Sequence, residues 1–212
     1  MYCTYLTSFQ PVEKENYGLR IRANKDHYRI GKMSAEDAVY LNTKKHKASP
    51  SEDGAIKKKT KKDSEPYDFR GGMLSSWHKL PFEVNGITYP TIEHWFQSQK
   101  FPNDPALQDK IRHASTPNMA KKLGQGEGIR NDWWKEREGG GSVREDVMYE
   151  GLLAKFSQHP KLLKKLKSTG DRLIRENSKG WGDEFWGIGS SGKGANKLGL
   201  LLMKVRDELE LN

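Results

Sequence analysis

The sequence of 212 residues lacks the features that mark secreted, disulfide-bonded or membrane-embedded proteins. Cys3 is its one cysteine, which excludes an internal disulfide and a zinc site built from several cysteines. No apolar run approaches the roughly 20 residues of a membrane-spanning helix, so we predict no membrane partner. The first residues also lack the apolar core of a secretion signal. We therefore expect an intracellular protein of the cytoplasm, with the nucleus as the alternative in a eukaryotic cell.

Positive charge is abundant, but it is concentrated in one segment. The chain has 37 Lys and Arg against 28 Asp and Glu, a net charge of +9. Residues 44–62 contain eight lysines and two acidic residues, so this segment carries +6 of that charge. It has almost no bulky apolar side chains and cannot bury enough surface to fold alone. We interpret residues 44–66 as a basic disordered linker whose lysines are solvated, act as an import signal or contact nucleic acid.

The linker divides the chain into two unequal parts. Residues 1–43 form an N-terminal extension for which the sequence indicates no role. Residues 67–212 have the length of one domain and contain all six tryptophans. We therefore expect the function to lie in this second part.

Local patterns in residues 67–212 are mainly helical. Asn85-Gly86, flanked by alternating apolar residues, predicts a β-hairpin over residues 81–89. Thr91 is typical of a helix N-cap and begins a predicted helix through Lys100. Amphipathic patterns predict four further helices, over residues 115–123, 144–159, 161–167 and 195–211. The expected fold is α+β, mainly α, with one small sheet.

Residues 187–194 read Gly-Ile-Gly-Ser-Ser-Gly-Lys-Gly and are similar to two nucleotide-binding motifs. Gly194 stands where a P-loop needs Ser or Thr to hold Mg²⁺, and no buried strand precedes either motif. We therefore exclude a P-loop and a Rossmann site. The loop can still offer backbone N–H groups to an anion, or it can be a plain flexible connection.

Metal and cofactor sites have no support in the sequence, because no histidines or acidic residues show the spacing of metal ligands. We predict that the protein needs neither. Trp133, Trp181 and Trp186 lie among glycines and charged residues rather than in apolar runs. Aromatic side chains in such surroundings suit stacking on a flat heterocycle, although each tryptophan alone can equally be core.

A longer series of motifs is similar to the NADAR family of YbiA-like N-glycosidases. Its most specific part is residues 89–101, Tyr-Pro-Thr-Ile-Glu-His-Trp-Phe-Gln-Ser-Gln-Lys-Phe. Asp132-Trp133, Glu176-Asn177-Ser178, residues 185–189 and residues 194–199 follow in the family's order. The resemblance covers about residues 69–210.

The resemblance implies a metal-independent hydrolase that cleaves an N-glycosidic bond between a phosphorylated ribose and a nitrogenous base. Its substrates would be ribosylaminopyrimidine phosphates of riboflavin synthesis, or ADP-ribose linked to guanine. The chain departs from the family pattern at two points. Ser76 replaces an expected amide in Leu74-Ser75-Ser76-Trp77, and the interval from Glu176 to Asp183 is about two residues longer than usual. Both departures concern the choice of substrate more than the reaction.

We assign Glu93 as the main catalytic carboxylate and Asp183 as the second. Lys100, expected on the same helical face as Glu93, either binds ribose or phosphate, attacks the sugar to form an imine, or only pairs with Glu93. The predicted ligand-binding residues are Ser76, Trp77, Trp133, Trp186, Gly187, Gly189 and Asn196. The alternative is a non-catalytic ADP-ribose or nucleotide reader, tethered to nucleic acid through residues 44–62.

Overall fold

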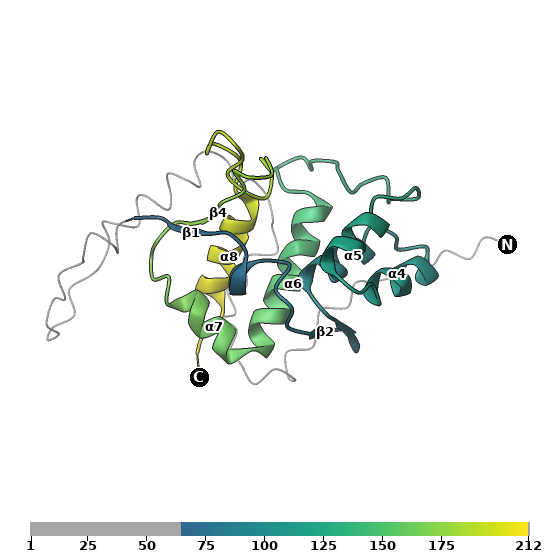
Figure 1. Cartoon of the computed structure of the whole chain (residues 1–212), viewed down its shortest axis with the longest axis horizontal. Helices are drawn as coiled ribbons and strands as arrows, with labels where there is room; N and C mark the ends of the chain where they lie inside the picture. Colours follow the sequence, from purple (N-terminus) through teal and green to yellow (C-terminus); the bar gives the residue numbers. More distant parts are fainter. Residues whose placement is uncertain (1–64, 212) are drawn as a thin grey trace, which may run out of the picture.

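The computed structural model describes residues 65–211, which build a mainly helical domain (Figure 1). The predicted N-terminal extension and all but the last two residues of the predicted linker lie outside the described residues. Within residues 65–211, no helix is long and apolar enough to cross a membrane.

Six α-helices make up most of the regular structure of the described part. They are α3 (Ile92–Ser98), α4 (Pro105–Arg112), α5 (Pro117–Leu123), α6 (Val143–Gln158), α7 (Pro160–Lys167) and α8 (Lys197–Glu208). Short strands and one 3-10 helix complete the fold: β1 (Tyr67–Phe69), η2 (Gly72–Leu74), β2 (Phe82–Val84), β3 (Ile87–Tyr89) and β4 (Ile174–Glu176). The prediction of a mainly α, α+β fold is confirmed.

Side-chain caps explain where three of the helices begin. Thr91 caps α3, Asp104 caps α4 and Thr116 caps α5, each accepting a hydrogen bond from the backbone N–H three residues later. Such a bond satisfies one of the N–H groups that the first turn of a helix leaves unpaired. These caps fix the position of α3, whose first turn carries Glu93.

Helix α3 ends two residues earlier than the sequence predicted. Gln99 is the C-cap, and Lys100 lies in the following turn, with its N–H 3.4 Å from the Gln97 carbonyl. The Ser98 hydroxyl donates to the Trp95 carbonyl at 2.8 Å and so competes with the helical bonding pattern. The expectation that Glu93 and Lys100 share a helical face is therefore wrong.

The strands form two separate pairs. β2 and β3 are an antiparallel hairpin with Phe82 opposite Tyr89, and its turn residues Asn85 and Gly86 both have positive φ, 51° and 77°. β1 and β4 are parallel, with Phe69 opposite Glu176. The hairpin confirms the Asn-Gly prediction, whereas the β1–β4 pair was not predicted.

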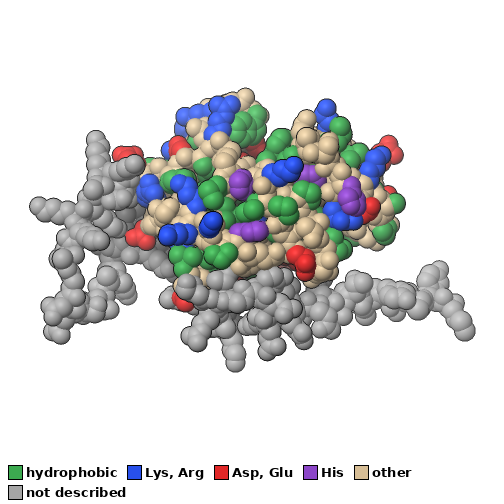
Figure 2. Space-filling model, turned by 60° about the horizontal axis from the view of Figure 1, so that its bottom comes forward, with side chains coloured by type: hydrophobic (Ala, Val, Ile, Leu, Met, Phe, Trp, Pro, Cys, Tyr) green, Lys and Arg blue, Asp and Glu red, His purple; other side chains and the backbone are tan. Residues whose placement is uncertain are grey.

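The core lies where α6 packs against α8, with α3 on the other side of α6 (Figure 1). The fully buried side chains of this core include Leu152 from α6 and Leu202 from α8. A smaller cluster of Phe101, Ile111 and Ala120 holds α4 and α5 together at one end of the domain. Lys and Arg side chains lie in several separate groups on the face shown in Figure 2, among hydrophobic and neutral ones.

Candidate active site

Glu93 lies in the first turn of α3 and is 6% exposed. The Gln97 side-chain amide donates to its carboxylate at 2.8 Å. Burial raises the pKa of Glu93, while the Gln97 amide, Lys121, Lys100 and the Trp77 side chain all favour its charged form. A buried carboxylate with one hydrogen-bonded side and cations nearby is suited to act on a substrate.

The segment before β2 closes over the start of α3. The Ser76 carbonyl accepts a hydrogen bond from the Glu93 N–H at 3.1 Å, while the Ser76 side chain is buried. Trp77 follows and is 42% exposed, and its side chain lies close enough to the Glu93 carboxylate to favour the charged form. Ser76 thus contributes through its backbone, and Trp77 presents a ring to solvent beside Glu93.

Glu176, at the end of β4, is a site residue to which the sequence assigned no role. Its pKa is raised to about 7 by burial first, and then by the nearby negative charges of Asp183 and Glu93. The carboxylates of Glu93 from α3 and of Asp183 from the loop after β4 therefore lie close enough to Glu176 to raise its pKa. A carboxyl group that holds its proton near neutral pH can act as a general acid.

Asp183 also shapes the loop that carries it. One carboxylate oxygen accepts hydrogen bonds from the backbone N–H groups of Phe185, at 3.0 Å, and Trp186, at 2.8 Å. Its own backbone carbonyl accepts from the Ser178 hydroxyl at 2.6 Å. Asp183 therefore lies near Glu176 and orders the turn into Trp186.

Lys100 is buried, with 5% exposed surface, and reaches the site from beyond the end of α3. Its ammonium donates to the Gly124 carbonyl at 3.0 Å and does not form an ion pair with Glu93. Burial lowers the pKa of Lys100 to about 8, although the charge of Glu93 acts in the opposite direction. A substantial fraction of neutral amine is therefore present near neutral pH, which an imine-forming lysine needs.

The amino-acid sequence that forms this site matches a known protein family. The NADAR domain family matches residues 60–210. The chain belongs to the NADAR family. The N-glycosidase YbiA of Escherichia coli is 38% identical over 142 residues, which cover 66% of this chain and 82% of that protein.

A solved structure and a second kind of relative support this assignment. The NMR structure of E. coli YbiA has a TM-score of 0.59 and 36% identity, covering 68% of this chain and 84% of that one. A riboflavin biosynthesis protein of Vibrio vulnificus is 35% identical over 145 residues, which cover 68% of this chain and 37% of that protein. The NADAR domain thus has the YbiA-like fold that the motifs indicated.

The tryptophans of this NADAR domain divide into core and surface. Trp133 is completely buried and packs against Phe96 at 5.0 Å between ring centroids, so its predicted stacking role is replaced by packing. Trp186 is half-buried and meets Phe96 edge-on at 5.4 Å. Trp134, to which no role was assigned, is 58% exposed, and the Lys100 ammonium lies 5.8 Å from its ring. Trp134 is therefore better placed than Trp133 to stack on a ligand.

The glycine-rich loop packs closely against β4 and Ser178. A Cβ on Gly187 would lie 2.8 Å from the Glu176 carbonyl oxygen, so only glycine allows this approach. The Gly189 N–H already donates to the Ser178 hydroxyl at 2.8 Å. The two glycines therefore let the loop lie against Glu176, and their contact with a phosphate stays a prediction.

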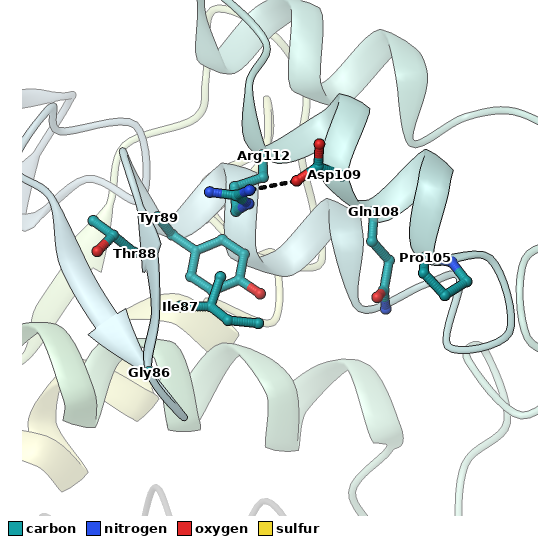
Figure 3. A pocket seen from close by; sticks show the side chains of 8 residues that line it. All are labelled: Gly86, Ile87, Thr88, Tyr89, Pro105, Gln108, Asp109 and Arg112. Atoms are coloured by element: carbon teal, nitrogen blue, oxygen red, sulfur yellow. Dashed lines mark hydrogen bonds and ion pairs between the residues drawn. The ribbon is translucent and has the colours of Figure 1, made fainter.

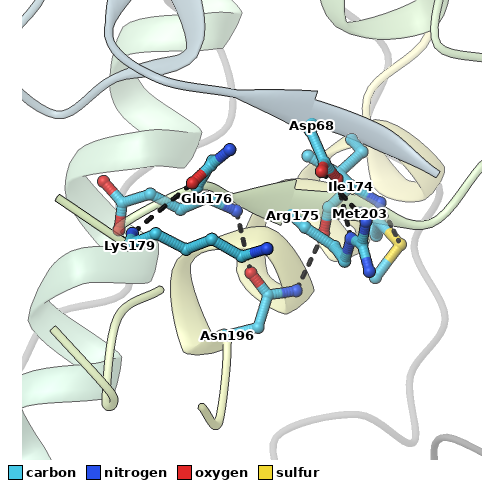
Figure 4. Close-up of polar contacts among 8 residues, drawn as sticks. Asp68, Ile174, Arg175, Glu176, Lys179, Asn196 and Met203 are labelled. Atoms are coloured by element: carbon cyan, nitrogen blue, oxygen red, sulfur yellow. Dashed lines mark hydrogen bonds and ion pairs between the residues drawn. The ribbon is translucent and has the colours of Figure 1, made fainter. Parts of the chain in front are cut away.

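Asn196 has a similar supporting role. Its side-chain oxygen accepts from the Glu176 N–H at 3.0 Å, and its amide nitrogen donates to the Ile174 carbonyl at 2.9 Å (Figure 4). Both ends of the amide are thus used along β4, and Asn196 positions Glu176 instead of contacting a ligand. Asn196 is the N-cap residue of α8 with a left-handed backbone, φ 52°, a conformation that asparagine adopts more readily than most residues.

A shallow pocket of about 460 Å³ lies elsewhere, between the β2–β3 hairpin and α4 (Figure 3). Tyr89 and Arg112 line it, and Arg112 is already paired with Asp109. None of the three site carboxylates lines this pocket. Among residues 65–211 there is also no group of three His, Cys, Asp or Glu that could hold a metal ion.

Proposed function

We propose that this chain is an N-glycosidase that hydrolyses the bond between a phosphorylated ribose and a nitrogenous base. The observation that carries the proposal is the pair of buried glutamates, Glu93 and Glu176, brought together from α3 and β4 with interacting charges. The names of its relatives, N-glycosidase YbiA among them, support the reaction type.

The reaction breaks the C1–N bond of the ribose. Positive charge develops on the sugar as the electron pair of that bond leaves with the base. A water molecule adds its oxygen to C1 and keeps one proton as the new sugar hydroxyl, while its other proton restores the carboxyl group that gave a proton to the base nitrogen. An ionised carboxylate stabilises the sugar cation, and a protonated carboxyl group delivers the proton to the base.

The surroundings of the two glutamates favour one division of these roles. Burial raises the pKa of both glutamates. Glu93 also has a hydrogen-bond donor in Gln97 and cations in Lys121 and Lys100, which oppose this rise by stabilising its negative charge. Glu176 has two carboxylates near it, and they favour its protonated form. Glu93 therefore stabilises the sugar cation, Glu176 is the general acid, and Asp183 keeps the Glu176 proton in place.

Lys100 has two roles open to it, and one measurement separates them. As a binder, its ammonium holds a ribose hydroxyl or phosphate. As a nucleophile, its amine attacks C1, the base leaves, and the opened sugar forms an imine that water hydrolyses. The pKa of about 8 is compatible with both roles.

The base is expected to stack on exposed aromatic rings at this edge of the site. Trp134 and Trp77 are the most exposed tryptophans adjoining the catalytic side chains, and Trp186 supplies a half-buried edge. Arg144, in α6, lies 5.3 Å from the Trp134 ring and 3.5 Å from the Phe185 ring and pairs with Glu136, so it is the nearest guanidinium to this edge that a phosphate could share. Phosphorylated ribosyl compounds do not cross membranes unaided, so we expect the reaction to take place in the cytoplasm.

Ribosylaminopyrimidine phosphates are the preferred substrate class, because relatives in Vibrio vulnificus and Zea mays are named riboflavin biosynthesis proteins. The test is a parallel assay of released base from a ribosylaminopyrimidine phosphate and from an ADP-ribosylated guanine oligonucleotide. We expect hydrolysis of the first to exceed that of the second.

Other results of this assay carry equally clear meanings. Preference for the oligonucleotide would transfer the proposal to the second substrate class. In a separate binding measurement, affinity for the oligonucleotide that falls steeply with salt and vanishes when residues 44–62 are deleted would assign these residues a nucleic-acid contact. Binding of ADP-ribose with no release of base from either compound would refute the enzyme and leave a reader.

A further inference from the structure

Three side chains near the end of α6 hold the backbone of residues 78–83. All three lie on the last turn and a half of the helix or directly after it, and each contacts backbone atoms of the segment that leads into the hairpin. Lys155 donates to the His78 carbonyl, Gln158 bonds the N–H and the carbonyl of Glu83 at 2.8 and 2.7 Å, and a His159 ring nitrogen lies 2.7 Å from the Pro81 carbonyl.

Lys155 differs from the other two because it is buried, with 1% exposed surface. Its ammonium lies 5.8 Å from the Phe82 ring, and no carboxylate of the described residues forms an ion pair with it. Burial lowers the pKa of Lys155 to about 7. A buried amine that has a carbonyl partner but no ion pair costs stability relative to an apolar side chain of the same length, so stability alone does not account for Lys155.

The contact made by Lys155 is next to the site. Its partner His78 directly follows Trp77, whose side chain lies close enough to the Glu93 carboxylate to favour the charged form. One residue earlier, the Ser76 carbonyl accepts the Glu93 N–H. The backbone of this segment is therefore held by α3 at one end and by Lys155 at the other, with Trp77 between them.

We propose that Lys155 is a positioning residue, which fixes the backbone at His78 so that Trp77 stays against Glu93. Lys155 acts through Trp77 and does not touch the substrate. Without its donor, the His78 carbonyl loses its partner, the segment relaxes, and Glu93 loses one of the groups that favour its charged form. The inference rests on the proposed function, since it concerns the rate of that reaction.

The test is a double-mutant cycle between Lys155→Met and Trp77→Phe, with released base as the readout. Met has similar length but no donor, and we expect kcat to fall about tenfold, the effect of losing one hydrogen bond to a charged group, with KM within about twofold. Lys155→Arg keeps a donor and should recover most of the rate. On the Trp77→Phe background, Lys155→Met should lower kcat by less than about twofold.

Gln158→Leu is the matched control, because Gln158 holds the far end of the same segment at Glu83. It should keep the wild-type kcat. A wild-type kcat in Lys155→Met would overturn the proposal. So would a tenfold loss of kcat when Lys155→Met is added to Trp77→Phe, or a tenfold loss of kcat in Gln158→Leu. Lys155→Gln, with a shorter polar side chain, is the second variant, and failure of both variants to fold would assign Lys155 to the fold alone.

Amide hydrogen exchange separates this proposal from the proposed function, because it needs no substrate. Exchange of residues 75–79 should rise at least fivefold in Lys155→Met and stay unchanged in Gln158→Leu. Unchanged exchange in Lys155→Met would overturn the anchoring role. If the wild-type protein releases no base but the exchange result holds, the proposed function fails while the anchor stands.

Discussion

Glu176→Gln is the substitution with the most distinctive expected outcome, because it should lower activity and raise stability together. The wild-type carboxyl group is buried beside Asp183 and Glu93, and its pKa is raised to about 7. A glutamine has nearly the same shape, but it has no acidic proton to give to the leaving base and no negative charge for Asp183 and Glu93 to repel. The loss of activity follows from the missing acid, and the gain in stability follows from the missing charge.

The sign and size of the stability effect follow from proton linkage. Between the ordinary value of 4.5 and about 7, the folded protein binds more protons at Glu176 than the unfolded chain does. Stability contributed at low pH is therefore lost as pH rises through this window. At about 1.4 kcal/mol for each tenfold change in acidity, the loss is at most about 3 kcal/mol at pH 8, and Glu176→Gln should recover it.

The assay pairs the rate of base release with thermal unfolding at pH 5 and pH 8. Wild-type activity should fall as pH rises through about 7, and Glu176→Gln should reduce kcat by about 10²- to 10⁴-fold, the usual contribution of a general acid. Its stability should exceed that of wild type by less than about 1 kcal/mol at pH 5 and by about 3 kcal/mol at pH 8. Glu184→Gln, an exposed carboxylate in the same loop, should change neither quantity. Near-wild-type kcat in Glu176→Gln, or lower stability at pH 8, would refute the reasoning.

Three further experiments test other parts of the site. If Lys100 is the nucleophile, borohydride with substrate should trap a covalent adduct whose yield rises as pH passes about 8, and Lys100→Arg should give none; no adduct in wild type would leave the binding role. Gly187→Ala places a Cβ 2.2 Å from the nearest side-chain oxygen and should cost about 1–3 kcal/mol of unfolding free energy, whereas Gly126→Ala, with its nearest atom at 3.6 Å, should unfold like wild type. Trp134→Ala should raise KM about tenfold with unchanged melting temperature, while Trp133→Ala should cost about 3–5 kcal/mol of stability; the reverse pattern in binding assays and thermal melts would contradict the division into surface and core.

The parts of the fold that depend on neighbouring residues could be predicted from the sequence. Asn85-Gly86 specifies its hairpin through two positive φ angles that these residues adopt readily. Thr116 and its following proline mark the start of α5 for similar local reasons. By contrast, β1 and β4 are three residues each and pair across more than 100 residues of sequence, so no local pattern indicates them.

The site shows the same division. Glu93 could be identified because it stands in the most specific motif of the family. Glu176 stood in a motif too, but its raised pKa depends on Asp183 and Glu93, which only the folded chain brings near. Trp133 and Trp134 are adjacent in sequence, and only tertiary packing decides that one is buried and the other exposed.

The central claim is that Glu93 is the carboxylate that stabilises the positive charge on the sugar as the C1–N bond breaks. Its most direct test is the single-turnover rate of base release by Glu93→Gln on whichever compound the wild-type protein hydrolyses, measured beside thermal unfolding. We predict a variant that folds with the wild-type cooperativity, binds the substrate and releases base at least about 10³-fold more slowly, in the range of losses seen when charge stabilisation is removed. A folded Glu93→Gln variant with a near-wild-type rate would contradict the claim.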